Sequence, residues 1–579
     1  MKITSSRSLV AALVASLVTV GALSAQVTYT WNVDAAGNWD NPANWLPNTG
    51  FPDGIDDVAL FEFNITGNRT ITQNVAGLTL GTIVFNDTTP SNNFNISNTN
   101  AIRMEVSTGS ALIHAMTAGN WHTVGSVILA SDIELRADSP SGNSLRVSAL
   151  TETGGPRNVT KTGLGLVNAG GNWEHTGSTN ILAGTLTLGE PANRISATSA
   201  INISNATLQM GSVRRANPDR LNNTASVTLS GGVLLHNGDG NGANGTMNAR
   251  EVIGALTLDG GFNRLQMNFV TGPSSYQQTN EIEAATFARS NRATGIIRGN
   301  KLGSSDGGGV GLGATRIFIA GADPVGMVGG GGAAGTTTIS ILPYLIGGTT
   351  TTAADTFITY DNTVITTDIG KDDLGNPGNP TSGKVGFRPL NTSTEFATDL
   401  STSTLNTNVR RTSNQTLASA ALANALILTG NTNITANGGL TLQSGALLYS
   451  GGAGNTGIIG GTVGQTLDAS GRELVAHVVS TNTSGSGSPI TLRIDLAIDN
   501  ADGLTLGEVS LGGTYERRLL LTQINTYTGP TTINSGILEV TSTGTLGDGN
   551  VVIRNGVCSG FRTMLRWPTR PRFSWMRVV

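Results

Sequence analysis

The chain has 579 residues, of which 34 are lysine or arginine and 38 are aspartate or glutamate. Charged residues therefore make up 12%, about half the usual fraction of a soluble globular protein. There are 78 glycines without the collagen period, threonine is equally frequent, and a single cysteine excludes a disulfide scaffold. The net charge of −4 argues against a nucleic-acid binder, and 38% hydrophobic residues argue against disorder. This composition predicts an all-β protein.

Residues 1–25 have the organisation of a secretory signal peptide. Lys2 and Arg7 precede the apolar stretch Leu9–Leu23, and the small residues Ser24 and Ala25 follow it. A membrane anchor is the alternative, but the stretch is short and no basic stop-transfer cluster follows. We therefore expect an exported chain with no transmembrane span after cleavage.

Short alternating segments recur along the rest of the chain. Residues 185–188, 226–229 and 440–442 alternate apolar side chains with threonine or serine, the signal of a half-buried strand. Glycine, asparagine, aspartate and serine separate such segments and favour turns. Outside the signal peptide only Leu417–Leu428 has a pattern that also fits a helix, although 424–428 fits a strand as well. We expect low helix content.

Two distant segments share the pattern Thr-Gly-x-Thr-x-Ile-x-x-Gly-x-Leu. The matching residues are Thr176, Gly177, Thr179, Ile181, Gly184 and Leu186 in the first unit, and Thr528, Gly529, Thr531, Ile533, Gly536 and Leu538 in the second. Tyr527 precedes the second unit, and His175 stands at the same place in the first.

Such repeats favour a β-solenoid. One unit cannot bury its apolar face alone, whereas stacked units bury a continuous aliphatic core. Asparagine and threonine suit the stack because like polar side chains hydrogen-bond along it. With about 20–25 residues per coil and ~4.8 Å between coils, we predict one elongated parallel β-helix of order 100 Å. Several antiparallel sandwiches are the alternative.

The second unit, 525–538, resembles the autotransporter-associated (passenger-associated) β-strand repeat. That family's hallmark is Asn-Thr-Tyr-Thr-Gly-x-Thr-x-Ile-x-x-Gly-x-Leu, often after a Leu-Thr-Lys-x-Gly lead-in, which Val159–Gly163 matches. Further blocks resembling large secreted proteins of this type lie at 31–61, 80–85, 340–344, 386–390 and 473–477. The resemblance implies a right-handed β-helix that is secreted or displayed on the outer surface of a Gram-negative-type bacterium. It implies no common enzymatic activity and no catalytic residues.

The predicted organisation follows from these features. We expect a signal peptide at 1–25, an N-terminal cap and first coils at 26–100, solenoid at 101–300 with a repeat unit near 161–188, a Gly/Thr-rich looped region at 301–410, solenoid at 411–555 with a repeat unit near 519–540, and an atypical tail at 556–579. The tail has five arginines, two tryptophans and no acidic residue. We interpret it as frameshifted or truncated; a basic aromatic arm is the alternative.

Residues that could carry chemistry are few. Asp53, Asp56 and Asp57 form the best acidic group, and we interpret it, like Asp323 and Lys371–Asp373, as a solvated turn. Other candidates are the histidines 114, 122, 175, 236 and 477, which lack zinc-site spacing, the Gly309–Ala314 loop, which precedes a strand rather than a helix, and Cys558, which lies in the tail. We expect no catalytic residue, no cofactor and no metal.

Five tryptophans offer rings for stacking on sugars. Because packing is the commoner role, we predict that Trp31, Trp39 and Trp45 cap the first coils; Trp121 and Trp173 lie further along.

These features favour a non-enzymatic surface or extracellular repeat protein for adhesion, matrix or envelope structure. The alternative is a carbohydrate-active β-helix enzyme, either a polysaccharide lyase or a hydrolase, with paired acids beside a sugar bond. Expected partners are extracellular polysaccharide or other cell-surface components, not nucleic acid.

Overall fold

The computed structural model describes residues 26–87, 92–117, 121–140, 142–190, 193–211, 220–238, 247–269, 278–304, 314–352, 354–365, 383–481, 487–509, 515–554 and 564–566. The predicted signal peptide, the Gly309–Gly313 loop, Lys371–Asp373, Cys558 and most of the 556–579 tail lie outside these ranges.

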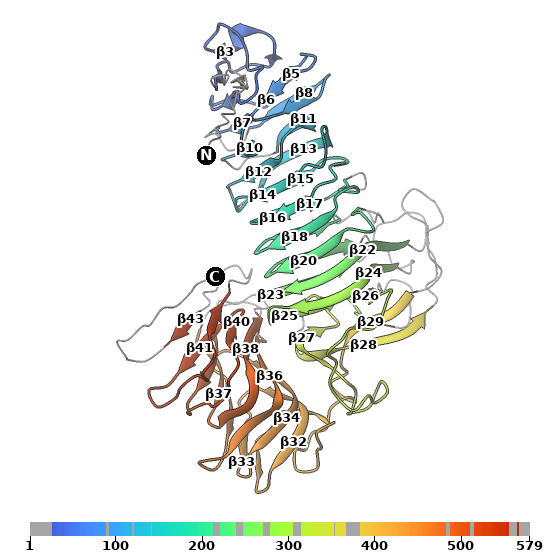
Figure 1. The fold of residues 1–579 in the computed structure, drawn as a ribbon, viewed down its shortest axis with the longest axis vertical. Helices are drawn as coiled ribbons and strands as arrows, with labels where there is room; N and C mark the ends of the chain where they lie inside the picture. The colour runs from blue at the N-terminus through green and yellow to red at the C-terminus, as the bar shows by residue number, and fades with distance from the viewer. Residues whose placement is uncertain are drawn as a thin grey trace, which may run out of the picture.

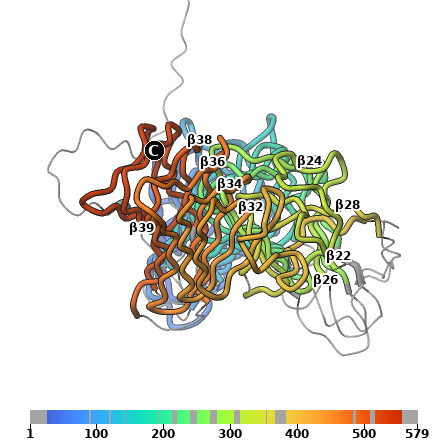
Figure 2. Tube along the Cα trace, turned by 90° about the horizontal axis from the view of Figure 1, so that it is seen from below, coloured from blue at the N-terminus to red at the C-terminus, as the bar shows by residue number. Residues whose placement is uncertain are grey.

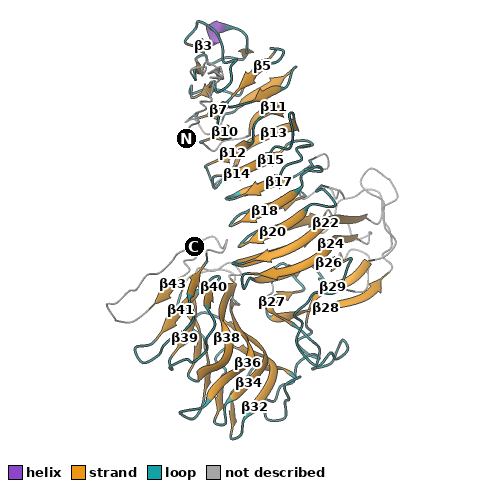
Figure 3. Cartoon of the chain, viewed as in Figure 1, coloured by secondary structure: helices purple, strands orange, loops and turns teal. Residues whose placement is uncertain are grey.

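The described chain is all-β, as its composition predicts (Figures 1 and 3). Its one helical element within those ranges is the 3-10 turn η1 (Pro42–Asn44), which Asn41 caps through a bond from the Ala43 amide. No helix in this part of the chain is long and apolar enough to cross a membrane.

The strands form two pairs of large sheets, and the first pair is the N-terminal stack. Sheet I runs in spatial order through β26 (Ala314–Ile319), β24 (Gln278–Ser290), β22 (Met247–Asp259), β20 (Ser226–Ser230), β18 (Ala200–Ser204), β16 (Thr179–Ile181), β14 (Val159–Thr162), β12 (Ile133–Ala137), β10 (Ala111–Ala115), β7 (Thr82–Phe85), β4 (Val58–Phe61), β1 (Thr28–Trp31) and β3 (Trp45–Leu46). Sheet II runs through β2 (Gly37–Asn38), β5 (Arg69–Gln73), β8 (Phe94–Asn98), β11 (His122–Leu129), β13 (Asn143–Glu152), β15 (Leu166–Ala169), β17 (Thr185–Leu188), β19 (Thr207–Met210), β21 (Val233–Gly238), β23 (Phe262–Phe269), β25 (Thr294–Gly299), β27 (Leu342–Gly348), β28 (Thr356–Ile365) and β29 (Gly383–Pro389), with β6 (Thr79–Leu80) and β9 (Ile102–Met104) beside it.

The second pair is the C-terminal stack. Sheet III runs through β30 (Asn408–Arg411), β32 (Ala421–Thr429), β34 (Leu440–Gly451), β36 (Thr466–Ser480), β38 (Ala497–Val509), β40 (Thr531–Ile533) and β42 (Val551–Ile553). Sheet IV runs through β31 (Gln415–Leu417), β33 (Asn433–Ala436), β35 (Thr456–Gly460), β37 (Ile490–Ile494), β39 (Arg517–Leu521), β41 (Ile537–Val540) and β43 (Met564–Arg566).

Consecutive strands alternate between the two sheets of a stack. From β10 to β27, and from β30 to β43, each strand pairs in parallel with the strand two places further along the chain. One rung, meaning one strand from each sheet, takes 20 residues between Asn158 and Ser178 and 32 between Gln266 and Arg298. The predicted 20–25 residues per coil therefore holds only for part of the chain, because later rungs carry longer strands and loops.

The alternation of side chains places the core between the paired sheets. β12 and β20 bury every second residue, so aliphatic side chains point inward and polar ones outward. Parallel register stacks like on like: Ile181 lies opposite Ile203, and Asn202 donates a hydrogen bond of 2.9 Å to the Asn180 amide oxygen. The predicted polar ladder is confirmed at this pair.

The prediction of one continuous rod is wrong. β27, β28 and β29 pair antiparallel, so the parallel progression of the first stack ends there. The second stack then lies against the first, with β38 beside β25 and with β34 and β36 beside β27 (Figures 1 and 2).

Residues 417–428 form strand rather than helix. β31 ends at Leu417 and β32 covers Ala421–Thr429, in which six consecutive residues are buried. The buried run arises because β32 faces two cores: Leu426 packs in the core of the C-terminal stack, and Ile427 packs in a cluster shared with the N-terminal stack. A strand covered on both faces shows a continuous apolar run, which periodicity cannot distinguish from a buried helix.

Candidate functional site

The two repeat units occupy equivalent places in their stacks. Thr179–Ile181 is the strand β16 of sheet I, and Thr531–Ile533 is the strand β40 of sheet III. In both stacks the motif begins in this sheet and continues into the other one, at β17 and β41. The threonines, isoleucines and leucines common to both units match in burial: Thr176 and Thr528 are exposed, and Thr179, Thr531, Ile181, Ile533, Leu186 and Leu538 are buried. Gly184 and Gly536 both have positive φ. The motif thus corresponds to one rung of the stack, with one strand in each sheet.

The first motif glycine is required by close approach of the preceding rung. A Cβ atom on Gly177 would lie 2.2 Å from the Arg157 carbonyl oxygen, and one on Gly529 would lie 2.3 Å from that of Asp502. Both distances are far inside contact range, so a larger residue would push neighbouring rungs apart. Gly184 and Gly536, with φ of +63° and +89°, instead supply a left-handed turn.

His175 replaces the tyrosine of the motif without losing its interaction. The Tyr527 hydroxyl lies 2.6 Å from Thr531 Oγ1, and His175 Nε2 lies 2.8 Å from Thr179 Oγ1. Both rings are buried, and burial lowers the pKa of His175 to about 4. The two units therefore fix the same turn through different chemistry.

The lysine of the lead-in lies in the core. Lys161 is stacked between Leu135 and Ile181, and its Nζ donates to the carbonyl oxygens of Thr162, Gly163 and Ala183 at 2.7, 2.7 and 3.0 Å. Burial lowers its pKa to about 8. Three carbonyls satisfy the three ammonium protons, which makes burial of the charge tolerable.

The carboxylates of the acidic turn, Asp53, Asp56 and Asp57, accept hydrogen bonds from backbone amides of the turn itself and of other segments. Asp57 is buried, and its carboxylate accepts hydrogen bonds from the amides of Val27 and Asp53 at 3.1 and 3.3 Å. Asp53 is exposed but accepts from the Thr79 amide, and Asp56 accepts from that of Ser107. The prediction of a solvated turn is wrong for Asp57, because the carboxylates hold together successive loops at the first rungs. Asp323, by contrast, is exposed and accepts a bond from the Asn362 side chain.

The histidines are dispersed. His122 stacks on Phe85 at 4.8 Å and accepts from the Phe94 amide, and burial lowers its pKa to about 4. His114 lies 2.7 Å from Asp138 on the flank, and burial lowers the pKa of His236 to about 3. In the described ranges no three His, Cys, Asp or Glu side chains gather as they would around a metal ion.

The N-terminal tryptophans pack rather than face solvent. Trp31, Trp39 and Trp45 are fully buried, with Trp45 at 5.2 and 4.9 Å from the other two rings and 5.6 Å from Phe61. They belong to the hydrophobic core of the N-terminal stack, at strands β1 and β3 and beside β4, so the preference for packing over an exposed sugar-stacking role is confirmed for these three rings. Trp173 is also buried, while Trp121 is half-buried.

Sequence reasoning missed a set of buried ion pairs in sheet I. Glu281 on β24 accepts from Arg250 at 2.7 Å and from Arg316 at 2.8 Å, and all three side chains are almost fully buried. Their strands are adjacent, so the charges alternate in sign across three rungs. The only signal was a pair of glutamates, 281 and 283, inside an otherwise strand-like segment.

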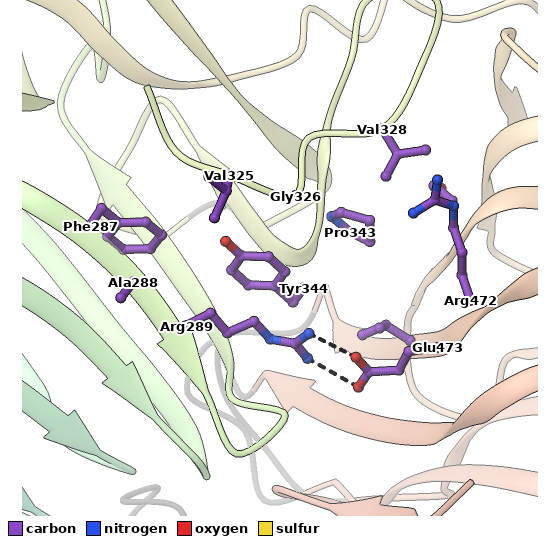
Figure 4. A pocket seen from close by; sticks show the side chains of 12 residues that line it. Phe287, Ala288, Arg289, Val325, Gly326, Val328, Pro343, Tyr344, Arg472 and Glu473 are labelled. Atoms are coloured by element: carbon purple, nitrogen blue, oxygen red, sulfur yellow. Dashed lines mark hydrogen bonds and ion pairs between the residues drawn. The ribbon is translucent and has the colours of Figure 1, made fainter. Parts of the chain in front are cut away.

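The junction between the stacks brings together blocks that the sequence analysis left without a role. Glu473 and His477 of β36 face Pro343 and Tyr344 of β27: His477 Nε2 lies 3.2 Å from the Pro343 carbonyl oxygen. Arg289 of β24 donates two hydrogen bonds to Glu473, at 2.7 and 3.0 Å (Figure 4). The 340–344 and 473–477 blocks therefore form one interface.

Further contacts hold the junction. Arg292 lies 3.6 Å from Glu473 and 3.1 Å from Asp502, and the Asn534 side chain donates to the Arg292 carbonyl at 2.7 Å. An apolar cluster shared by the two stacks covers the rest of the junction, with Ile296, Ile346, Phe357, Ile427, Leu448 and Val479 among its members.

A cavity of about 270 Å³ opens at this junction (Figure 4). Phe287, Val325, Tyr344 and Val475 supply apolar walls, together with Val328 and Pro343; Arg289, Arg472 and Glu473 supply the charges. The Arg289 guanidinium lies over the Tyr344 ring, 4.4 Å from its centre.

Burial and the local charges set the protonation of the groups here. Burial raises the pKa of Tyr344 to about 12 and lowers that of His477 to about 4. Burial alone would raise the pKa of Glu473, but Arg289, with help from the Thr505 hydroxyl and Arg292, holds it below its ordinary value. At neutral pH Glu473 is thus an anion, while Tyr344 and His477 are neutral.

The 386–390 block lines a second cavity, of about 580 Å³, near Lys301 and Asp355. Arg388 in that wall donates to Glu395 at 2.8 and 3.0 Å and lies 3.5 Å from Asp361. Arg388 is therefore occupied by two carboxylates of its own chain.

No protein-family model, no curated protein and no solved structure matched this chain.

Replacing Gly529 by alanine is expected to lower the stability of the C-terminal stack by about 1–3 kcal/mol, the usual cost of overpacking. The reason is the 2.3 Å approach of a Cβ to the Asp502 carbonyl oxygen. Gly460→Ala is the matched control, because its nearest neighbour would be the Asp495 Cβ at an ordinary 3.5 Å. Thermal unfolding followed by circular dichroism measures both; equal midpoints for the two variants would contradict the close-approach argument.

Replacing His175 by tyrosine should reduce acid sensitivity. The folded-state pKa of about 4 lies below the unfolded value of 6.5, so the unfolded chain binds the proton first. The stability that neutral His175 contributes is complete above about pH 6.5 and is lost as the pH falls toward 4. Tyrosine does not titrate there, so the fall in melting temperature between pH 7 and pH 5 should shrink.

The reciprocal variant Tyr527→His is the control for this expectation. It should steepen the same pH dependence, because the buried ring at 527 would then resist protonation as His175 does. An unchanged pH profile in both variants would show that this position does not govern acid stability.

Replacing Glu473 by glutamine should destabilise the junction by about 2–3 kcal/mol. Arg289 would keep hydrogen-bonding atoms but lose its counter-charge, and breaking a buried pair on one side is costly. Arg493→Gln is the matched control, since Arg493 is more exposed and pairs locally with Asp495. Urea unfolding should show a clear loss for the first variant and under about 1 kcal/mol for the second; similar losses would argue against a special role for the junction pair.

Proposed function

We propose that this chain is an exported, non-enzymatic β-helical repeat protein of the outer cell surface or extracellular matrix, of the autotransporter-associated β-strand repeat type. Its role would be adhesion or matrix or envelope structure. The observation that carries the proposal is the likeness of the two repeat units at their shared positions: the shared threonines, isoleucines and leucines match in burial, and the second glycine has positive φ in both.

The strand order supports the β-helical part of the proposal. Successive strands alternate between two sheets and pair in parallel with the next rung, which is the connectivity of a coil. Connections between parallel strands of one sheet are right-handed in about 98% of cases, so a right-handed coil is expected.

The outward columns support a role in which a long surface makes many weak contacts. Thr160, Asn180, Asn202, Thr228 and Thr257 lie in register on successive strands of sheet I, and all five are half-buried. Neutral hydroxyls and amides repeated in this way offer donors and acceptors to hydroxyl-rich polymers such as extracellular polysaccharide.

Export is the second part of the proposal. The charged start, apolar stretch and small residues of 1–25 support it, as does the resemblance of the repeat motif. The setting would be the exterior of a Gram-negative-type bacterium.

A carbohydrate-processing enzyme is the second candidate. The junction cavity favours it, since Arg289, Arg472 and Glu473 gather there beside an aromatic ring. Against it stands the engagement of Glu473 by two arginines and the Thr505 hydroxyl, which leaves that carboxylate poorly placed to accept a proton.

One experiment separates the candidates. The folded protein is incubated with a panel of extracellular polysaccharides, and both co-sedimentation and release of new reducing or unsaturated ends are measured. We expect association without release. Reproducible cleavage, abolished by replacing one carboxylate, would overturn the non-enzymatic proposal. In parallel, residues 1–25 fused to a reporter that is active only outside the cytoplasm should yield activity; an inactive reporter would overturn the export proposal.

A further inference from the structure

The junction cavity contains one cation, Arg472, that no described residue neutralises. Arg472 is exposed and lines the cavity, and no described residue lies within ion-pair distance of its guanidinium. Figure 4 shows its side chain extending along the cavity beside Pro343 and Val328. Its chain neighbour Glu473 points the other way, to Arg289.

The other charges of the cavity cancel. Glu473 is bound twice by Arg289 and approached by Arg292, which itself pairs with Asp502. Two arginines thus meet two carboxylates, and Arg472 remains as a net charge of about +1. A neutral ligand would desolvate that guanidinium without replacing its water, whereas a carboxylate would form a bidentate pair with it.

The remaining walls fit a sugar ring. Tyr344 is only 5% exposed, and no described group bonds its hydroxyl. Burial raises its pKa to about 12, so the hydroxyl keeps its proton and is available as a donor. Phe287 and Val325 add apolar surface, and a volume of about 270 Å³ is near the lower limit of small-molecule pockets, suited to one ring rather than several.

We propose that this cavity binds a uronate residue of an acidic polysaccharide, with Arg472 pairing with the carboxylate and with Phe287, Val325 and Tyr344 forming the wall against the sugar ring. The inference rests on the proposed extracellular function, in which it specifies the partner. Arg289 and Glu473 act as positioning residues, since they hold Tyr344 and the two stacks in place. Val325, 81% exposed, forms the rim.

The test is titration calorimetry of the full-length folded protein with short galacturonate and glucuronate oligomers. The same oligomers with their carboxyl groups reduced to alcohols are the matched ligands. We expect the acidic form to bind at least tenfold more tightly than the reduced form, and the preference to weaken as salt rises.

Three variants locate the binding. Arg472→Gln should weaken binding of the acidic oligomer at least tenfold. Arg493→Gln, which changes a half-buried arginine paired with Asp495 elsewhere in the same stack, should leave binding unchanged. Val325→Trp should reduce binding by filling the rim of the cavity. Because the Val325 side chain is 81% exposed, this substitution should not disturb folding, and a loss of binding can be assigned to the cavity. Circular dichroism melting confirms that each variant is folded.

Several outcomes would overturn the inference: no binding of either acidic oligomer, equal binding of the reduced form, an Arg472→Gln variant that binds like wild type, or inorganic phosphate binding as tightly as the oligomers. Each leaves the surface proposal standing if export and polysaccharide association hold. Failure of export together with tight, Arg472-dependent uronate binding would overturn the surface proposal alone.

Discussion

The structure depends on parallel pairing between successive rungs. A strand of three to five residues cannot hold itself, and its inward aliphatic side chains need the next rung to exclude water. In-register pairing meets both needs. The backbone edge of each strand is hydrogen-bonded to the next rung, and inward aliphatic side chains lie opposite one another, as Ile181 does opposite Ile203. The same register aligns the outward side chains, so the Asn180–Asn202 ladder follows from the core rather than from a separate selection for polar stacking.

The junction applies a second constraint, burial of one sheet on both faces. β32, β34 and β36 are longer than their counterparts in sheet IV, and their C-terminal halves are covered by both stacks. Charged side chains can enter such a contact only in satisfied pairs. Arg289 and Glu473 meet that condition through two direct bonds, and the small excess of charge falls on Arg472 at the open side.

Local sequence patterns were enough to predict the strands and turns that lie within a single rung. The alternating segments and the motif from Thr528 to Leu538 predicted strands, turns and the burial of the apolar side chains. What could not be read locally is what distant segments impose. Arg289 and Glu473 are 184 residues apart, and nothing near either indicates the other. The buried run at 423–428 resembled a helix because its second covering surface comes from the other stack. Asp57 was misjudged for the same reason: the amide of Val27 that it accepts from belongs to another segment.

The stacking of rungs also makes the resistance of the molecule to mechanical force depend on the direction of that force. The backbone hydrogen bonds of the N-terminal stack join one rung to the next, so a force that lifts one end of the terminal strand along the stacking axis would break its hydrogen bonds one after another and peel that rung first. Shear along the strands would instead load every bond of an interface together. The contacts from Arg289 to Glu473 and from Asn534 to Arg292 cross between stacks rather than between rungs. Peeling of the N-terminal stack would therefore stop at the rungs that carry these contacts, because the two stacks would have to separate before it could continue.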